Sequence, residues 1–136
     1  MDIDRLKTLP LFADLSKREL ERIATWADEV DLPAGKHLIE QGAFAHEFFV
    51  IAEGTAEVTH DGRHLADLGP GDFFGEIALL ENQRRTASVI ATSPLRVVVM
   101  FAREFEAMER ELPEVAARVR DAMMARRGRN QDAGAS

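Results

Sequence analysis

Between residues 30 and 101 the chain divides into short β-prone segments, each ended by turn residues. The sharpest boundary is Asp61-Gly62, a pair typical of a two-residue hairpin turn between residues 55–60 and 63–68. The other β-prone segments are residues 30–32, 37–40, 48–52, 86–91 and 96–101, with turn signals at Pro33-Ala34-Gly35, Glu53-Gly54 and Pro70-Gly71. About eight short strands at this spacing predict a jelly roll or small barrel.

Helical patterns lie on both sides of these strands. Within residues 1–30, Ser16 and Glu19 fit a capping box and are followed by an apolar helix face. After the strands, residues 103–111 predict a short helix, and Pro113 suits the first turn of a second helix that ends near residue 127, before Gly128. The expected fold is mainly β with flanking helices: an eight-stranded jelly-roll β-barrel with an N-terminal helix and two C-terminal helices.

Length and composition limit the possible classes of protein. The 136 residues, 46% of them hydrophobic, suffice for one domain with one core, which we expect over residues 1–130, with a disordered polar tail over 131–136. No apolar run reaches the ~20 residues of a membrane span. The N-terminus lacks a signal-peptide pattern, and the chain has no cysteine, so we expect a cytoplasmic location. The net charge of −7 argues against direct nucleic-acid binding.

Residues 74–91, Phe-Gly-Glu-Ile-Ala-Leu-Leu-Glu-Asn-Gln-Arg-Arg-Thr-Ala-Ser-Val-Ile-Ala, combine small residues with a carboxylate and an arginine pair. Gly75 and Ala78 lack bulk, so their backbone N–H groups are open to a ligand. Arg85 supplies a planar fork that matches two phosphate oxygens. Glu76 accepts hydrogen bonds when ionised, so beside a phosphate it must face a donor such as a ribose hydroxyl. A phosphate together with a ribose indicates a nucleotide.

This segment closely resembles the phosphate-binding cassette of the cyclic nucleotide-binding domain family. The family includes regulatory subunits of cyclic-nucleotide-dependent kinases, cyclic-nucleotide-gated channels and bacterial catabolite-activator-like regulators. The first half of its pattern matches residues 74–79 here, and the second half matches residues 85–89 and Ala91. Arg84 stands where many members have proline. The wider resemblance covers about residues 10–127, including the glycines that end the predicted strands.

The resemblance implies a role for each matched residue. Glu76 would bind the ribose 2′-hydroxyl and Arg85 the cyclic phosphate, while backbone N–H groups complete the cradle. The expected ligand-binding residues are Gly75, Glu76, Ile77, Ala78, Arg85, Thr86 and Ala87. In the family the last helix closes over the base, which makes Met123, Met124 and Arg127 candidate base contacts, with packing on the barrel as the alternative for the methionines. Thr86 leaves the choice between cyclic AMP and cyclic GMP open.

The sequence thus predicts a stand-alone, non-enzymatic sensor that captures cyclic AMP or cyclic GMP and signals to a protein effector through its C-terminal helices. No catalytic cofactor or metal is expected. One alternative is a degenerate family member that serves as a protein-interaction scaffold without ligand. Another is a cupin-like metal protein, but the histidines lack the close pairing of a metal site; they are His37, His46, His60 and His64.

Overall fold

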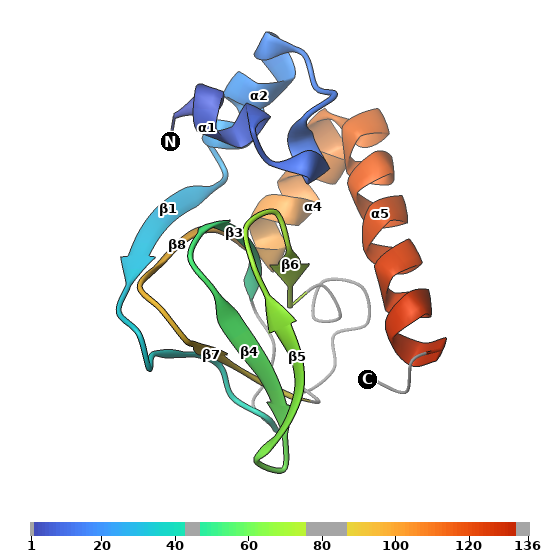
Figure 1. Cartoon of the computed structure of the whole chain (residues 1–136). Helices are drawn as coiled ribbons and strands as arrows, with labels where there is room; N and C mark the ends of the chain where they lie inside the picture. The colour runs from blue at the N-terminus through green and yellow to red at the C-terminus, as the bar shows by residue number, and fades with distance from the viewer. Residues whose placement is uncertain (1, 43–46, 76–86, 133–136) are drawn as a thin grey trace.

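The structure, a computed structural model, describes residues 2–42, 47–75 and 87–132 (Figure 1). Its helices are α1 (Ile3–Lys7), the 3-10 helix η1 (Pro10–Phe12), α2 (Lys17–Ala24), α4 (Ala102–Glu111) and α5 (Pro113–Asp132). Its strands are β1 (Asp28–Leu32), β2 (His37–Ile39), β3 (Glu47–Glu53), β4 (Ala56–His60), β5 (Arg63–Leu68), β6 (Phe73–Phe74), β7 (Ser88–Ala91) and β8 (Leu95–Phe101). The predicted class, mainly β with flanking helices, is confirmed.

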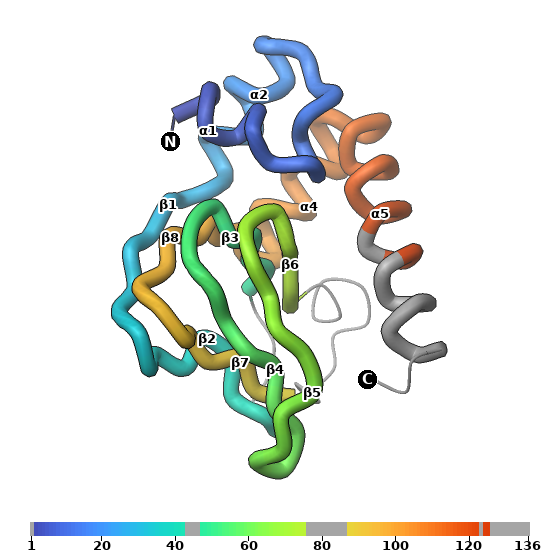
Figure 2. The backbone as a smooth tube through the Cα atoms, viewed as in Figure 1, coloured from blue at the N-terminus to red at the C-terminus, as the bar shows by residue number. Residues whose placement is uncertain are grey.

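The strands form two antiparallel four-stranded sheets. The first has the order β1-β8-β3-β6 and the second the order β2-β7-β4-β5. Figure 2 shows the second sheet at the lower part of the molecule, with β7 beside β4. Among the described residues no strand pairing joins the two sheets, so the predicted barrel is present as two facing sheets that are not closed.

Strands β3 and β8 contribute side chains to two separate cores. Because successive side chains of a strand point to opposite faces, Phe49 and Ile51 of β3 enter the inter-sheet core, whereas Phe48 and Val50 enter the helical core. The inter-sheet core is Ile39, Phe49, Ile51, Ala56, Leu68, Phe74, Val89, Ala91, Leu95 and Val97. The helical core joins the four strand residues Phe48, Val50, Val98 and Met100 to buried residues of the helices and their connections. The two middle strands of the first sheet are therefore packed on both faces.

In Figure 1 α1 and α2 lie at the top of the molecule with α4 below them, and α5 starts near the top and runs down the right side. Leu6, Phe12 and Ile23 from the N-terminal part and Phe105 and Met108 from α4 are almost fully buried together. Helix α5 joins this core by Val115, Ala116 and Val119. Among the side chains that the structure describes in α5 after Val119, those of residues 120–122, 124 and 125, none belongs to the core. Arg120 still contacts α4, with its guanidinium 5.5 Å from the centre of the Phe105 ring and 2.6 Å from Glu109.

The predicted hairpin is confirmed. Asp61 and Gly62 have φ angles of 51° and 78°, the left-handed conformation that a two-residue turn of this kind requires at both central positions. The flanking strands β4 and β5 pair antiparallel with a register shift between Val58 and Thr59.

Some elements differ from the sequence-based expectations. One N-terminal helix was expected, whereas α1, η1 and α2 precede β1. Strand β6 was not predicted, because two residues carry no periodicity. Helix α5 continues past Gly128 to Asp132, although Gly128 was expected to end it. A glycine inside a helix costs only about 1 kcal/mol relative to alanine, which the surrounding arginines, good helix formers, can offset. Residues 131 and 132 of the expected tail thus belong to α5, and residues 133–136 lie outside the described residues.

No described helix is long and apolar enough to cross a membrane.

The capping box at the start of α2 generates a prediction. Ser16 Oγ accepts a hydrogen bond from the Glu19 N–H at 3.1 Å, and the Glu19 carboxylate accepts one from the Ser16 N–H at 2.8 Å, which lowers the pKa of Glu19. We expect Ser16→Ala to lower the free energy of unfolding by about 1 kcal/mol, measured by urea denaturation. Ser16→Thr retains the hydroxyl and serves as the control. Equal losses in both variants would contradict the role of the cap.

Candidate functional site

The candidate site is the segment 74–91, whose two ends lie on different sheets. We call the described residues on the two sides of 76–86 its leading end, Phe73–Gly75, which includes the residue before the segment, and its trailing end, Ala87–Ser88. The leading end belongs to β6 at the edge of the first sheet, and the trailing end begins β7 in the interior of the second. The predicted ligand-binding residues between them lie outside the described residues and stay predictions: Glu76, Ile77, Ala78, Arg85 and Thr86. Gly75 and Ala87 are described.

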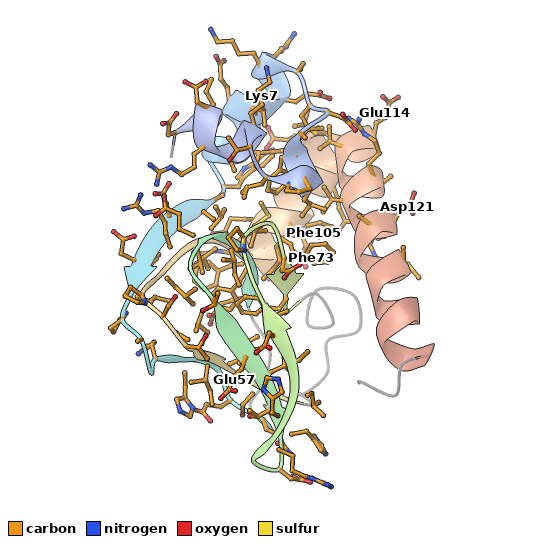
Figure 3. The ribbon with its side chains drawn as sticks, viewed as in Figure 1. Lys7, Glu57, Phe73, Phe105, Glu114 and Asp121 are labelled. Atoms are coloured by element: carbon orange, nitrogen blue, oxygen red, sulfur yellow. The ribbon has the colours of Figure 1, made fainter. Side chains whose placement is uncertain are left out.

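Two aromatic side chains hold the leading end in both cores. Phe74 stacks on Phe49, its register partner in β3, with ring centroids 5.0 Å apart and an interplanar angle of 16°. Phe73 points the other way, with its ring centroid 5.8 Å from that of Phe48. It packs against the helical core, and Figure 3 shows it close to Phe105 of α4. The leading end is therefore coupled both to the opposite sheet and to the helices.

A tight turn directly precedes β6. The Asp72 carboxylate accepts a hydrogen bond from the Gly69 N–H at 2.7 Å, and the Asp72 carbonyl accepts one from the Ile51 N–H at 2.8 Å. Gly71 has a φ of +90°, and an added Cβ there would lie 3.2 Å from Pro10 Cδ. The turn is thus held between β3 and the N-terminal helical segment.

Gly75, directly after β6, has a φ of +88°. L-residues with side chains rarely adopt this conformation, because the Cβ comes too close to the following carbonyl oxygen. The glycine lets the chain turn away from the sheet at the position where the predicted cradle begins. The structure therefore supplies a backbone reason for this glycine that is separate from its expected contact with a ligand.

The trailing end is held by strand pairing and by one hydroxyl group. Ser88 pairs with Thr59 of β4, and the next residue, Val89, pairs with both Val58 of β4 and Ile39 of β2. Ser88 Oγ accepts a hydrogen bond from the Gln41 N–H at 2.9 Å. Sequence reasoning missed this contact, because no local pattern connects residues 47 positions apart.

The candidate base contacts lie on α5. Met124 is 53% exposed, so its side chain is not packed in a core. The side chains of Met123 and Arg127 lie outside the described residues. Of these three side chains the structure thus describes that of Met124, which is exposed to solvent.

The described histidines pair with carboxylates on the surface. His37 lies 2.8 Å from Glu40, and His64 lies 3.0 Å from Glu57. His60 lies 3.3 Å from the neighbouring Asp61. Within residues 2–42, 47–75 and 87–132, no three His, Cys, Asp or Glu side chains gather in a way that could hold a metal ion. His46 lies outside these ranges.

An open groove of about 380 Å³ lies between the β1–β2 turn and the β7–β8 turn, away from the candidate site. Its charged centre is Arg96, which donates to Asp31 at 2.8 Å and lies within 4.0 Å of Glu29 and Glu53. The hydrogen bond from Arg96 lowers the pKa of Asp31. Because three carboxylates surround this guanidinium, the groove does not favour an anion.

Comparisons with known proteins show the family to which the chain is similar. A family model described as cyclic nucleotide-binding domain matches residues 29–111. The chain is 34% identical over 132 residues to the cyclic AMP receptor protein of Thermus thermophilus, covering 93% of this chain and 61% of that protein. It is 32% identical over 120 residues to a cyclic nucleotide-gated potassium channel of Rhizobium etli, covering 88% of this chain and 34% of the channel.

The fold agrees as well. The crystal structure of the Thermus thermophilus catabolite activator protein superimposes with a TM-score of 0.79 at 33% identity, covering 92% of this chain and 61% of that chain. The chain thus spans less than two thirds of the length of each of these relatives.

The contribution of the Gly75 backbone conformation to stability can be tested by substitution. Because Gly75 has a φ of +88°, we expect Gly75→Ala to lower the free energy of unfolding by about 1–2 kcal/mol, measured by urea denaturation. Gly69→Ala is the matched control, since Gly69 is not in the left-handed region and an added Cβ there meets nothing within 4 Å. A loss at Gly69 as large as that at Gly75 would show that backbone conformation is not the cause.

Proposed function

This chain belongs to the cyclic nucleotide-binding domain family, and we propose that it binds a cyclic purine nucleotide non-covalently in the segment 74–91. The observation that carries the proposal is the complete string from Phe74 to Ala91, with both its carboxylate and its arginine, at the spacing of the family. The conformation of Gly75 and the anchoring of both ends support it. Such binding needs no catalytic group, so we propose a regulatory protein rather than an enzyme.

In this proposal Arg85 donates two parallel hydrogen bonds to the cyclic phosphate, and Glu76 accepts one from the ribose 2′-hydroxyl. The N–H groups of Gly75, Ala78 and Ala87 complete the cradle. The net charge of −7 does not oppose this arrangement. A charge-assisted hydrogen bond contributes about 1.5–3 kcal/mol, whereas exposed charges more than ~10 Å away are largely screened at 0.1 M salt.

For the base we favour adenine. The Thermus relative is named a cyclic AMP receptor protein, and its match covers 93% of this chain. Met123, Met124 and Arg127 are the proposed base contacts. They lie on the part of α5 that follows Val119, the last residue of this helix in the described helical core.

We infer a route by which binding reaches the helices. Phe73, at the leading end, packs against the helical core that contains Phe105 of α4 and Val115 of α5 (Figure 3). A nucleotide that favours one position of the leading end therefore shifts the equilibrium between positions of these helices. A cytoplasmic protein effector that contacts α5 would respond to this change in the positions of the helices.

Calorimetric titration with cyclic AMP and cyclic GMP tests the proposal. We expect both to bind, cyclic AMP more tightly, and Arg85→Ala to weaken binding by about tenfold to a hundredfold, the loss of a charge-assisted pair. Arg84→Ala removes the same charge one residue away and is the matched control, expected to change the Kd by about twofold at most.

Absence of heat and of any thermal shift with either nucleotide at millimolar concentration would refute the ligand. The protein would then be better described as an interaction scaffold that has kept the fold. Equal losses in the two arginine variants would instead remove Arg85 from its specific role and leave only an effect of net charge.

A further inference from the structure

Gln41 connects the tip of the β4–β5 hairpin to the trailing end of the candidate site. Its side-chain amide makes two hydrogen bonds to one residue of the hairpin turn: Oε1 accepts from the Asp61 N–H at 2.9 Å, and Nε2 donates to Asp61 Oδ1 at 2.9 Å. Its backbone N–H donates to Ser88 Oγ, also at 2.9 Å. One residue thus links segments that are 20 and 47 positions away in the sequence.

This link lies where the strand pairing of β7 ends. The pairing with β2 stops at Ile39–Val89, and the pairing with β4 stops at Thr59–Ser88. Gln41 lies two residues after the end of β2. Its hydrogen bond to Ser88 therefore extends the attachment of β7 on the β2 side by one residue toward the site. Ala87 is the next residue in that direction. It directly precedes Ser88, whose hydroxyl group accepts the hydrogen bond from Gln41.

We propose that Gln41 is a positioning residue for the nucleotide. Together with Asp61 and Ser88 it holds the trailing end so that the Ala87 N–H meets the phosphate in the correct place. The inference rests on the proposed function. Binding groups must be held to within about 0.5 Å of their productive position, so a loose trailing end weakens binding even when the fold is intact.

The chain contains a matched contact at the far end of β7. Ser93 Oγ accepts a hydrogen bond from the Thr55 N–H at 2.9 Å, just as Ser88 Oγ accepts one from the Gln41 N–H. Both bonds join a serine hydroxyl near one end of β7 to the backbone of a neighbouring connection. Only the bond at Ser88 lies next to Ala87, the predicted cradle residue, so comparison of the two serines separates an effect on positioning from an effect on general stability.

The turn residue Asp61 allows a conservative variant. Its φ of 51° lies in the left-handed region, which asparagine tolerates, and Asp61→Asn keeps the Oδ1 acceptor for Gln41. Asp61→Gly suits the same backbone conformation but removes that acceptor. Comparison of the two variants isolates the hydrogen bond from the turn.

The first experiment measures the Kd for cyclic AMP and the melting temperature of the full chain. We expect Gln41→Ala, Ser88→Ala and Asp61→Gly each to weaken binding by about tenfold, as one lost positioning contact would. We expect Asp61→Asn and Ser88→Thr to bind as the wild type does. Ser93→Ala should lower the melting temperature as much as Ser88→Ala does but change the Kd by about twofold at most. An unchanged Kd in Gln41→Ala, or an equal loss of affinity in Ser93→Ala, would overturn the proposal.

The second experiment needs no ligand. In the free protein, amide hydrogen exchange at Ala87 and Ser88 should be faster in Gln41→Ala than in the wild type, and unchanged in Ser93→Ala. Gln41→Ala keeps the backbone N–H that donates to Ser88 Oγ, so unaltered exchange at these amides would show that the Gln41–Asp61 hydrogen bonds do not hold the trailing end. If the wild type binds no nucleotide but the variants show this exchange pattern, the proposed function is refuted, while the attachment of the trailing end by Gln41 is supported.

Discussion

The structure depends on the burial of β3 and β8 on both of their faces. A strand that is packed on one face alternates apolar and polar residues, but here neighbouring side chains such as Phe48 and Phe49 enter two different cores. Full burial of each such side chain contributes about 1.5–3 kcal/mol, so two strands stabilise both the facing sheets and the helical layer. The helical layer and the inter-sheet core therefore share these two strands.

The candidate site is built across this arrangement. Its leading end adds β6 to the edge of the doubly buried sheet, and its trailing end continues into β7 of the opposite sheet. Phe73 and Phe74 divide between the two cores in the same way as Phe48 and Phe49, against which they lie. A cradle whose ends lie on different sheets keeps its shape only while the inter-sheet core holds the sheets in place. Proposed binding and core packing are therefore coupled.

Local patterns predicted much of the fold. The Asp61-Gly62 turn and the capping box at Ser16 were correct because each depends on residues within one turn of the chain. Strand β6 was missed because its two residues form a strand only by pairing with β3. The end of α5 was misplaced because Gly128 can either end a helix or be tolerated inside one, and neighbouring residues alone do not decide between these outcomes.

The sequence by itself determined the family motif of the candidate site. The glycine, carboxylate and arginine of the segment 74–91 match the family pattern in identity and spacing, and neither depends on the fold. The sequence could not show that Gln41 meets both Asp61 and Ser88, or that Phe73 reaches the helical core. The tertiary structure alone decided these contacts. Side-chain identity and spacing are local properties of the chain, whereas the partner of a side chain depends on which distant segments the two cores bring together.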